Sequence, residues 1–382
     1  TPPLSSSSAA SDVYKRQRKW SSNRDCDCRS QSATGCGHFG GFRAFKRDAR
    51  FKLSIILDDL MQTVYPWQQN VWETLTSRFP EVGHGLLFYG KNGCGKHEFA
   101  QHFLAWILCS NKQAQAACGE CVSCQWLKSD THPNYVHIST DEENKKQNAK
   151  IKIEKIRELL PFVQQTVDGW RVIVIEPAEA LNIASSNALL KTLEEPGERI
   201  ILILLADHYL KLPATIRSRL QHFALDRISP EQALQYIQNK QPELSVEQIN
   251  LLLNLTGAMP LSALQLAESD WLNKRTDFMA DWTNLVIQKN KPIMLATKWS
   301  KELSFNDFIA MLEYLLGDVI CVKLNQSIKN IDLSFDQIVP AYTLEQLFEI
   351  YAEIQHAKQL VEQNVQTNLV LDQLFIKLMN VK

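Results

Sequence analysis

Residues 85–103 read GLLFYGKNGCGKHEFAQHF, and the order of residue types in this stretch predicts the fold of the first half of the chain. A short apolar run leads into a glycine-rich turn, and a helical pattern follows the turn. This is the context of the phosphate-binding loop G-x-x-x-x-G-K-[ST], whose backbone N–H groups surround a phosphate chain. The loop residues are Gly90, Gly93, Gly95 and Lys96, but His97 stands where a hydroxyl that holds Mg²⁺ is expected.

Three further apolar stretches alternate with helical patterns. They are YVHIST (135–140), RVIVIE (171–176) and RIILILLA (199–206). The last two are continuous apolar runs, which are typical of strands buried on both faces of a parallel sheet. The alternation of strands and helices predicts a doubly wound α/β domain over residues 61–226.

Beyond residue 227 the sequence has helical patterns only. Ser229 reads as a helix N-cap, and Ser245 with Gln248 reads as a capping box that opens a second helix. The apolar residues from Trp271 to the end recur with a helical period. We therefore expect a small helical domain and then a larger all-helical domain.

The composition limits the classes of function. The chain has 382 residues, of which 45% are hydrophobic, and a formal net charge of −1. Such a charge argues against a general polyanion binder, which would have a basic excess. No apolar run approaches the roughly 20 residues of a membrane span. Nine cysteines without a secretory signal predict a reducing, cytoplasmic environment, where clustered thiols more often bind metal than form disulfides.

The first 60 residues differ from the rest of the chain. They are rich in serine and arginine and have neither a helical nor a strand period. Cys26, Cys28, Cys36 and His38 could ligate a metal, but a C-x-C start fits structural zinc spacing poorly. We expect residues 1–60 to be a disordered leader that arises by read-through or is otherwise not native, and we exclude it from the fold.

A cluster of cysteines predicts a metal site. Cys109, Cys118, Cys121 and Cys124 have the spacing C-x8-C-x2-C-x2-C. Four thiolates complete a closed tetrahedron around Zn²⁺ and leave no position for a catalytic water, so the predicted site is structural. An iron–sulfur cluster is the alternative, because C-x2-C-x2-C also opens the ferredoxin pattern. That pattern continues x3-C-P, which is missing here, so zinc is favoured.

The segments SSNALLKTLEEP (185–196) and PATIRSRL (213–220), after the phosphate loop and the cysteine insert, resemble bacterial clamp-loader subunits. These AAA+ proteins open the sliding clamp and load it onto primed DNA for DNA polymerase III. The start YPW at Tyr65 looks like that of the delta-prime subunits of this family and not that of the motor subunits. The resemblance implies three domains: an AAA+ nucleotide-fold domain (61–226) with a zinc module (109–124), a helical lid domain (227–270) and a helical collar, or oligomerisation, domain (271–382).

The resemblance also implies that four catalytic positions of a motor are changed. His97 replaces the magnesium-binding hydroxyl, and Pro177, after Glu176, stands where a motor has the glutamate that activates water. Asp207 occupies the polar sensor position, where its negative charge would oppose a γ-phosphate. No arginine lies at residues 259–261, where a motor has its lid arginine. We expect no ATP turnover and weak or absent nucleotide binding, without Mg²⁺.

One catalytic element of the family is retained. Ser218 and Arg219 match the Ser-Arg-Cys motif, with Leu220 in place of the cysteine. In this family the arginine projects across the subunit interface, and an arginine finger stabilises charge on the transferring phosphoryl group of the neighbour. Arg219, with Ser218, is therefore the predicted catalytic contribution of this chain, supplied in trans.

These implications lead to one favoured function and two alternatives. The favoured function is a non-catalytic stator that contacts the gamma/tau motors and the delta subunit through the collar, and meets the sliding clamp and primed DNA mostly through the complex. An active gamma/tau-like motor that uses Lys96 and Glu176 is the alternative, and Pro177 argues against it. A zinc-dependent DNA-binding protein is disfavoured, because the zinc segment 109–128 has two lysines and no arginine.

Overall fold

A computed structural model describes residues 64–140, 150–165, 168–288 and 291–379. The strands of this described part form a five-stranded parallel sheet of order β2-β3-β4-β1-β5. Their bounds are Gly85–Tyr89 for β1, Tyr135–Ile138 for β2, Arg171–Ile175 for β3, Ile200–Ala206 for β4 and Gln221–Ala224 for β5. Because β4 lies between β1 and β3, the carboxyl ends of these three strands are neighbours at one edge of the sheet.

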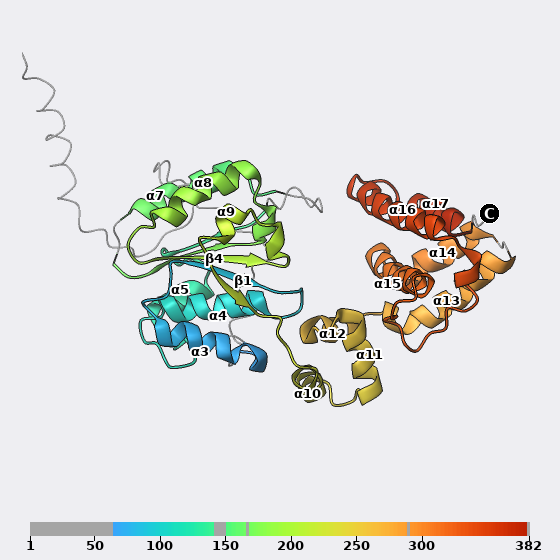
Figure 1. The fold of residues 1–382 in the computed structure, drawn as a ribbon, viewed down its shortest axis with the longest axis horizontal. Coiled ribbons are helices and arrows are strands. Elements are labelled where there is room, and N and C mark those ends of the chain that lie inside the picture. The colour runs from blue at the N-terminus through green and yellow to red at the C-terminus, as the bar shows by residue number, and fades with distance from the viewer. Residues whose placement is uncertain (1–63, 141–149, 166–167, 289–290, 380–382) are drawn as a thin grey trace, which may run out of the picture. The chain divides into compact units, whose positions relative to one another are not determined.

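Helices cover both faces of this sheet (Figure 1). Their bounds are Pro66–Gln68 for η1, Gln69–Arg78 for α3, Lys96–Leu108 for α4, Val122–Lys128 for α5, Ile153–Arg157 for α6, Leu159–Gln164 for α7, Ala178–Ala180 for η2, Ile183–Glu194 for α8, Tyr209–Lys211 for η3 and Ala214–Arg217 for α9. One buried cluster joins α3 and α4 to the sheet and includes Trp72 and Phe103. The cluster on the other face joins α6, α7 and α8 to the sheet and includes Leu159 and Leu189.

The described residues after β5 are helical. The bounds are Pro230–Lys240 for α10, Val246–Thr256 for α11, Pro260–Ala267 for α12, Trp271–Gln288 for α13, Pro292–Glu302 for α14, Phe305–Lys323 for α15, Val339–Ala341 for η4, Leu344–Glu362 for α16 and Thr367–Met379 for α17. Ser229 and Ser245 make the capping bonds expected of them, each with a glutamine three residues later. The predicted class, a parallel α/β sheet followed by helical regions, is confirmed.

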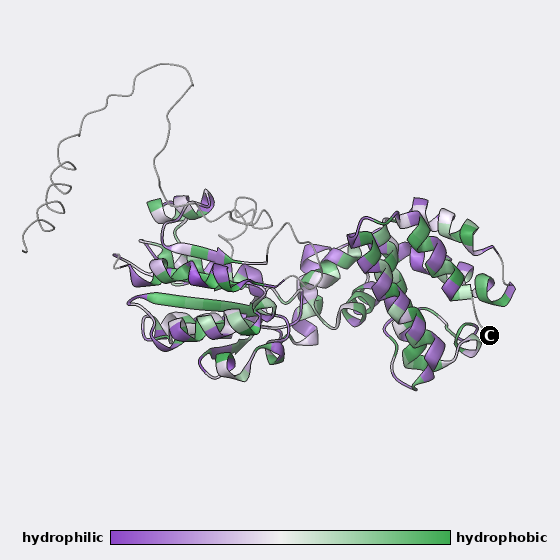
Figure 2. Cartoon of the chain, turned by 90° about the horizontal axis from the view of Figure 1, so that it is seen from above, coloured by the Kyte–Doolittle hydropathy of each residue, from purple (hydrophilic) through white to green (hydrophobic). Residues whose placement is uncertain are grey.

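Two details differ from the expectation. Strand β5 has no apolar run, since its four residues QHFA are exposed or half-buried at the edge of the sheet. Tyr351 of α16 belongs to the apolar residues that recur with a helical period after Trp271, yet 46% of its surface is exposed. In Figure 2 the strand at the centre of the sheet is green, whereas the helices carry both green and purple residues, as expected of amphipathic helices. The predicted leader, with Cys26, Cys28, Cys36 and His38, lies outside the described residues.

Among the described residues, no single helix is long and apolar enough to cross a membrane. The consecutive helices α11 and α12 meet the length and composition criteria only when taken together, and the chain bends by 114° between them.

Candidate functional site

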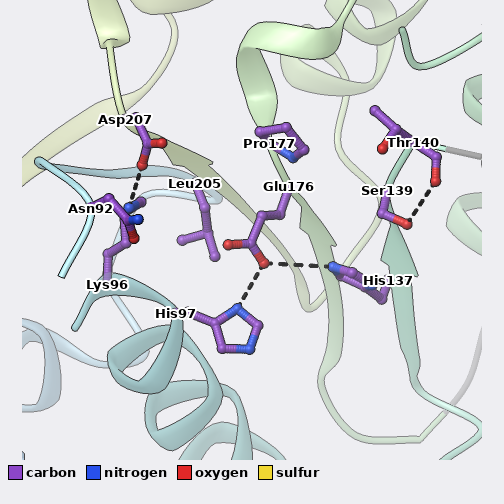
Figure 3. Close-up of a pocket in the computed structure, with 10 residues that line it drawn as sticks. All are labelled: Asn92, Lys96, His97, His137, Ser139, Thr140, Glu176, Pro177, Leu205 and Asp207. Carbon is purple, nitrogen blue, oxygen red and sulfur yellow. Dashed lines mark hydrogen bonds and ion pairs between the residues drawn. The ribbon is translucent and has the colours of Figure 1, made fainter. Parts of the chain in front are cut away.

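The site predicted from the glycine loop lies at the carboxyl edge of the sheet (Figure 3). The loop that follows β1, the first residues after β3 and the end of β4 meet there because β1, β4 and β3 are adjacent. They border a cavity of about 330 Å³. Its lining residues are Asn92, Lys96, His97, His137, Ser139, Thr140, Glu176, Pro177, Leu205 and Asp207.

The backbone of the glycine loop has the conformation that the motif requires. Gly93 and Gly95 have φ angles of 84° and 83°, in the left-handed region that favours glycine. Gly95 is the N-cap of α4, so the helix begins at Lys96, directly after the loop. The shape of a phosphate-binding loop at a helix N-terminus is therefore present.

The lysine of the loop has a partner within the chain. The ammonium group of Lys96 forms an ion pair with the carboxylate of Asp207, which follows β4. Burial lowers the pKa of Lys96, but the hydrogen bond and the charge of Asp207 outweigh burial and raise it. The positive charge that a motor directs at the outer phosphates is thus neutralised by an internal carboxylate.

A second ion pair occupies the place of the magnesium ligands. Nδ1 of His97 lies 2.8 Å from Oε2 of Glu176, and Nε2 of His137 lies 3.9 Å from the same oxygen. Burial would raise the pKa of Glu176, but the nearby imidazole of His137 and the hydrogen-bonded imidazole of His97 hold it at about 2. Burial lowers the pKa of His97, yet the hydrogen bond to Glu176 and its charge raise it above its ordinary value. The pair is therefore an imidazolium–carboxylate pair at mildly acidic pH.

These donors do not fit Mg²⁺. Magnesium prefers oxygen ligands in octahedral geometry, and an imidazole engaged with the nearby carboxylate offers neither a free oxygen nor a free charge. Pro177 lines the cavity where a motor would place its water-activating glutamate, and its ring has no acid–base chemistry.

The start of α12 is bonded to the glycine loop. The backbone N–H of Leu261 donates to the carbonyl of Gly93 at 3.2 Å, and Oγ of Ser262 donates to the carbonyl of Asn92 at 3.1 Å. Met259, at the N-cap of α12, is 4% exposed and packs into the cluster that contains α4. The segment that has no lid arginine therefore binds the loop through backbone and hydroxyl groups.

The residues before α3 support the loop from another side. The indole N–H of Trp67 donates to the carbonyl of Cys94 at 2.9 Å, and the amide of Gln68 donates to the carbonyls of Cys94 and Gly95. The ring of Tyr65 stacks on Trp67, and Tyr236 of α10 meets both rings edge-on. Gln68 and Tyr236 were not predicted as site residues, because neither belongs to a motif.

The four predicted metal ligands come together. The sulfur atoms of Cys109, Cys118, Cys121 and Cys124 all lie within 4.8 Å of one another. The Sγ atoms of Cys109 and Cys118 are 3.5 Å apart, close to the sulfur–sulfur spacing of a tetrahedral zinc site with bonds of about 2.3 Å. Backbone N–H groups of Cys118 and Cys121 donate to the sulfurs of Cys109 and Cys118, which favours thiolates. The geometry fits a zinc ion.

One of these thiols is poised to lose its proton. Burial would raise the pKa of Cys121, but hydrogen bonds from the backbone of Cys124 and Ser110 and from neighbouring thiols lower it to about 6. Burial raises the pKa of Cys124. The pKa values of Cys121 and Cys124 thus shift in opposite directions. With a bound metal ion all four groups would be thiolates, because metal ligation requires the thiols to be deprotonated.

Ser218 and Arg219 stand apart from the cavity lining. They follow α9, where Oγ of Ser218 donates to the carbonyl of Thr215 at 3.1 Å. Arg219 has 36% of its side chain exposed and forms a salt bridge with Glu194. Leu220 is 8% exposed and packs with α8 in the sheet domain, so leucine fills a core position in place of the cysteine of the motif.

Comparisons with known proteins point to one family. Residues 67–229 match the family model described as DNA polymerase III, delta subunit. The DNA polymerase III subunit delta' (delta prime) of Pseudomonas aeruginosa is 35% identical over 242 residues, or 63% of this chain and 72% of that protein. The delta-prime subunit of Haemophilus influenzae is 29% identical over 63% of this chain and 73% of its own. The subunit tau of Bacillus subtilis is 32% identical over a shorter region, 43% of this chain and 29% of its own.

Proposed function

Since the chain belongs to the DNA polymerase III delta-prime subunit family, we propose that it is the non-catalytic stator of the clamp loader. It is a subunit of the assembly that loads the sliding clamp onto primed DNA during replication, and the polymerase activity belongs to the holoenzyme. We place this assembly in the cytoplasm.

Two internal ion pairs support the absence of ATP turnover. Lys96 is paired with Asp207, and His97 is paired with Glu176. A motor would need the lysine for phosphate and the other positions for Mg²⁺ and water activation. Any nucleotide that bound here would have to compete with these carboxylates for the same cations.

Three further assignments complete the proposal. The cysteine cluster holds a structural Zn²⁺, because its four sulfurs can close a tetrahedron without a position for water. Residues 227–270 form the lid, and residues 271–382 form the collar through which the subunit contacts the gamma/tau motors and the delta subunit. Arg219, supported by Ser218, supplies the arginine finger to the neighbouring motor site.

The alternative function is an active motor, and the intact glycine loop with Lys96 is the observation that favours it. ATP turnover by the purified chain distinguishes the stator from this motor. We expect no hydrolysis above background with Mg²⁺, clamp and primed DNA present, and nucleotide binding that is weak or absent and insensitive to Mg²⁺. Isothermal titration calorimetry with ATP, with and without Mg²⁺, provides the second measurement. Tight binding that depends on Mg²⁺, or turnover by the isolated chain, would favour the motor.

A further inference from the structure

Arg219 has a partner on a different element of the fold. Its Nε donates to Oε1 of Glu194 at 2.9 Å, and Nη2 lies 2.6 Å from the same oxygen. Glu194 is the last residue of α8, and Arg219 follows the C-cap of α9, so this contact links two helices that β4 and η3 separate in the chain. The side chains are 36% and 51% exposed, so the pair is accessible to a neighbouring molecule.

The rest of the guanidinium folds back over its own helical turn. Nη1 donates to the carbonyl of Thr215, four residues earlier, at 2.8 Å and lies 3.4 Å from Oγ of Ser218. An arginine that reaches a phosphate on another subunit must present its planar fork of N–H groups to that phosphate. Here the fork is directed at partners within the chain, so the side chain is stored and not extended.

We infer that Glu194 is a positioning residue that stores Arg219 until a phosphate group of a nucleotide held by the neighbouring subunit displaces the carboxylate. This rests on the proposed role of Arg219 as a finger and adds a regulatory step to it. A polyphosphate competes well for the fork, since it offers several charged oxygens, whereas the contact with Glu194 uses only Oε1. The exchange is feasible because an exposed ion pair is weak.

The stored conformation has a consequence for the timing of hydrolysis. While Arg219 is held by Glu194, the neighbouring site lacks its cation, and ATP turnover stays low until the subunits close on clamp and DNA. Removing the charge of Glu194 increases the fraction of subunits in which the finger is free. Because an exposed ion pair is weak, losing it increases the population of the freed finger only modestly. We therefore expect basal turnover at the site that Arg219 serves to rise about two- to fivefold.

The test uses the loader reconstituted from this chain with its motor and delta subunits. The variants are Glu194→Gln, which keeps the shape but removes the charge, Glu195→Gln, Arg219→Ala and the double variant Glu194→Gln/Arg219→Ala. Glu195 is the matched control, since it is the adjacent exposed glutamate. ATP turnover is measured without and with clamp and primed DNA.

We expect Glu194→Gln to raise turnover in the absence of clamp and DNA and so to lower the ratio of stimulated to basal rates. Glu195→Gln should match the unmodified loader, and the double variant should behave like Arg219→Ala, because storage has no effect without the finger. Arg219→Ala could lower the stimulated turnover while Glu194→Gln and Glu195→Gln give the same basal turnover. That result would refute the storage of Arg219 by Glu194 but support the role of Arg219 as an arginine finger. A lower stimulated rate in Glu194→Gln would likewise refute storage. If Arg219→Ala has no effect, the finger itself fails.

Discussion

A phosphate loop that ends in histidine has a titratable nitrogen where serine or threonine would offer a neutral oxygen. In this chain the nitrogen binds a carboxylate: His97 and Glu176 form a partly buried pair, with His137 close to the same oxygen. Lys96 and Asp207 repeat this arrangement one residue away. The cationic residues of the loop are thereby used for internal stability, and the loop keeps its backbone shape without the charges that a phosphate needs.

The His97–Glu176 pair predicts a specific dependence of stability on pH. The raised pKa of His97 gives a contribution that is complete below about 6.5 and disappears as pH rises through the folded-state pKa. The lowered pKa of Glu176 gives a contribution that is complete above about 4.5 and disappears as pH falls toward about 2. His97→Gln should therefore destabilise the sheet domain most between about pH 4.5 and 6.5, on the order of 1–3 kcal/mol.

Urea unfolding at a series of pH values from 4 to 9 measures this effect, with His208→Gln as the control. His208 is an exposed histidine outside the cavity lining, so its replacement should give a small difference at every pH. A His97→Gln difference that is constant from pH 5 to pH 9 would contradict the charged pair.

At the scale of elements, the sequence predicted best those features that depend on neighbours in the chain. The strand, loop and helix around the glycines, the cysteine spacing and the capping boxes at Ser229 and Ser245 all follow local rules, and the structure has them. Contacts that depend on strand order were not predictable. The pairing of Lys96 with Asp207 requires β1 beside β4, and a short polar edge strand such as β5 gives no periodic signal.

The metal module supplies a prediction at this scale. Purified protein should carry one zinc per chain, and Cys121→Ser should lose it, because a closed thiolate site contributes directly to the folding of its own segment. Hydrogen exchange should then increase over residues 109–128 while the sheet remains protected. Elemental analysis measures the metal. Protein without zinc, or a brown preparation that contains iron, would overturn the assignment.

The hydrogen bonds between the start of α12 and the glycine loop supply a further prediction at the scale of elements. Gly93 has a φ of 84°, and a Cβ there would lie 2.1 Å from Oγ and 2.6 Å from the backbone N of Ser262. Gly93→Ala should cost about 2 kcal/mol or more, through backbone strain and overlap, and loosen residues 259–267 from the loop.

Gly317→Ala is the matched control for this change. Gly317 lies inside α15, and a Cβ there meets nothing within 4 Å. Alanine should therefore stabilise the chain by about 0.5–1 kcal/mol. Thermal unfolding and hydrogen exchange compare the two variants. Equal effects from both would show that the contact between Gly93 and Ser262 is not maintained in solution.

At the scale of the whole molecule, the cavity beside the glycine loop and Arg219 lie at different places in the fold. Lys96 and His97 of the glycine loop are held in internal ion pairs, whereas Arg219 remains exposed after α9. In the proposed stator role, a subunit with this combination would affect ATP hydrolysis only beside a competent neighbour. The collar, as proposed, brings that neighbour into place.

The last prediction compares Arg219→Ala with Lys96→Ala in the reconstituted clamp loader. Arg219→Ala should leave folding, zinc content and assembly nearly unchanged, because one exposed salt bridge contributes little. It should nevertheless reduce ATP turnover stimulated by clamp and DNA, since an arginine finger is worth about 10³–10⁵ in rate at the site it serves, or roughly 4–7 kcal/mol. Bulk turnover falls less if other motor sites keep their own fingers. Arg219→Lys should restore little of the lost turnover, because an ammonium cannot reproduce the planar fork.

Lys96→Ala should change turnover little, because Lys96 is bound to Asp207 and not to phosphate. A larger defect from Lys96→Ala than from Arg219→Ala would reverse the assignment and make this chain a motor.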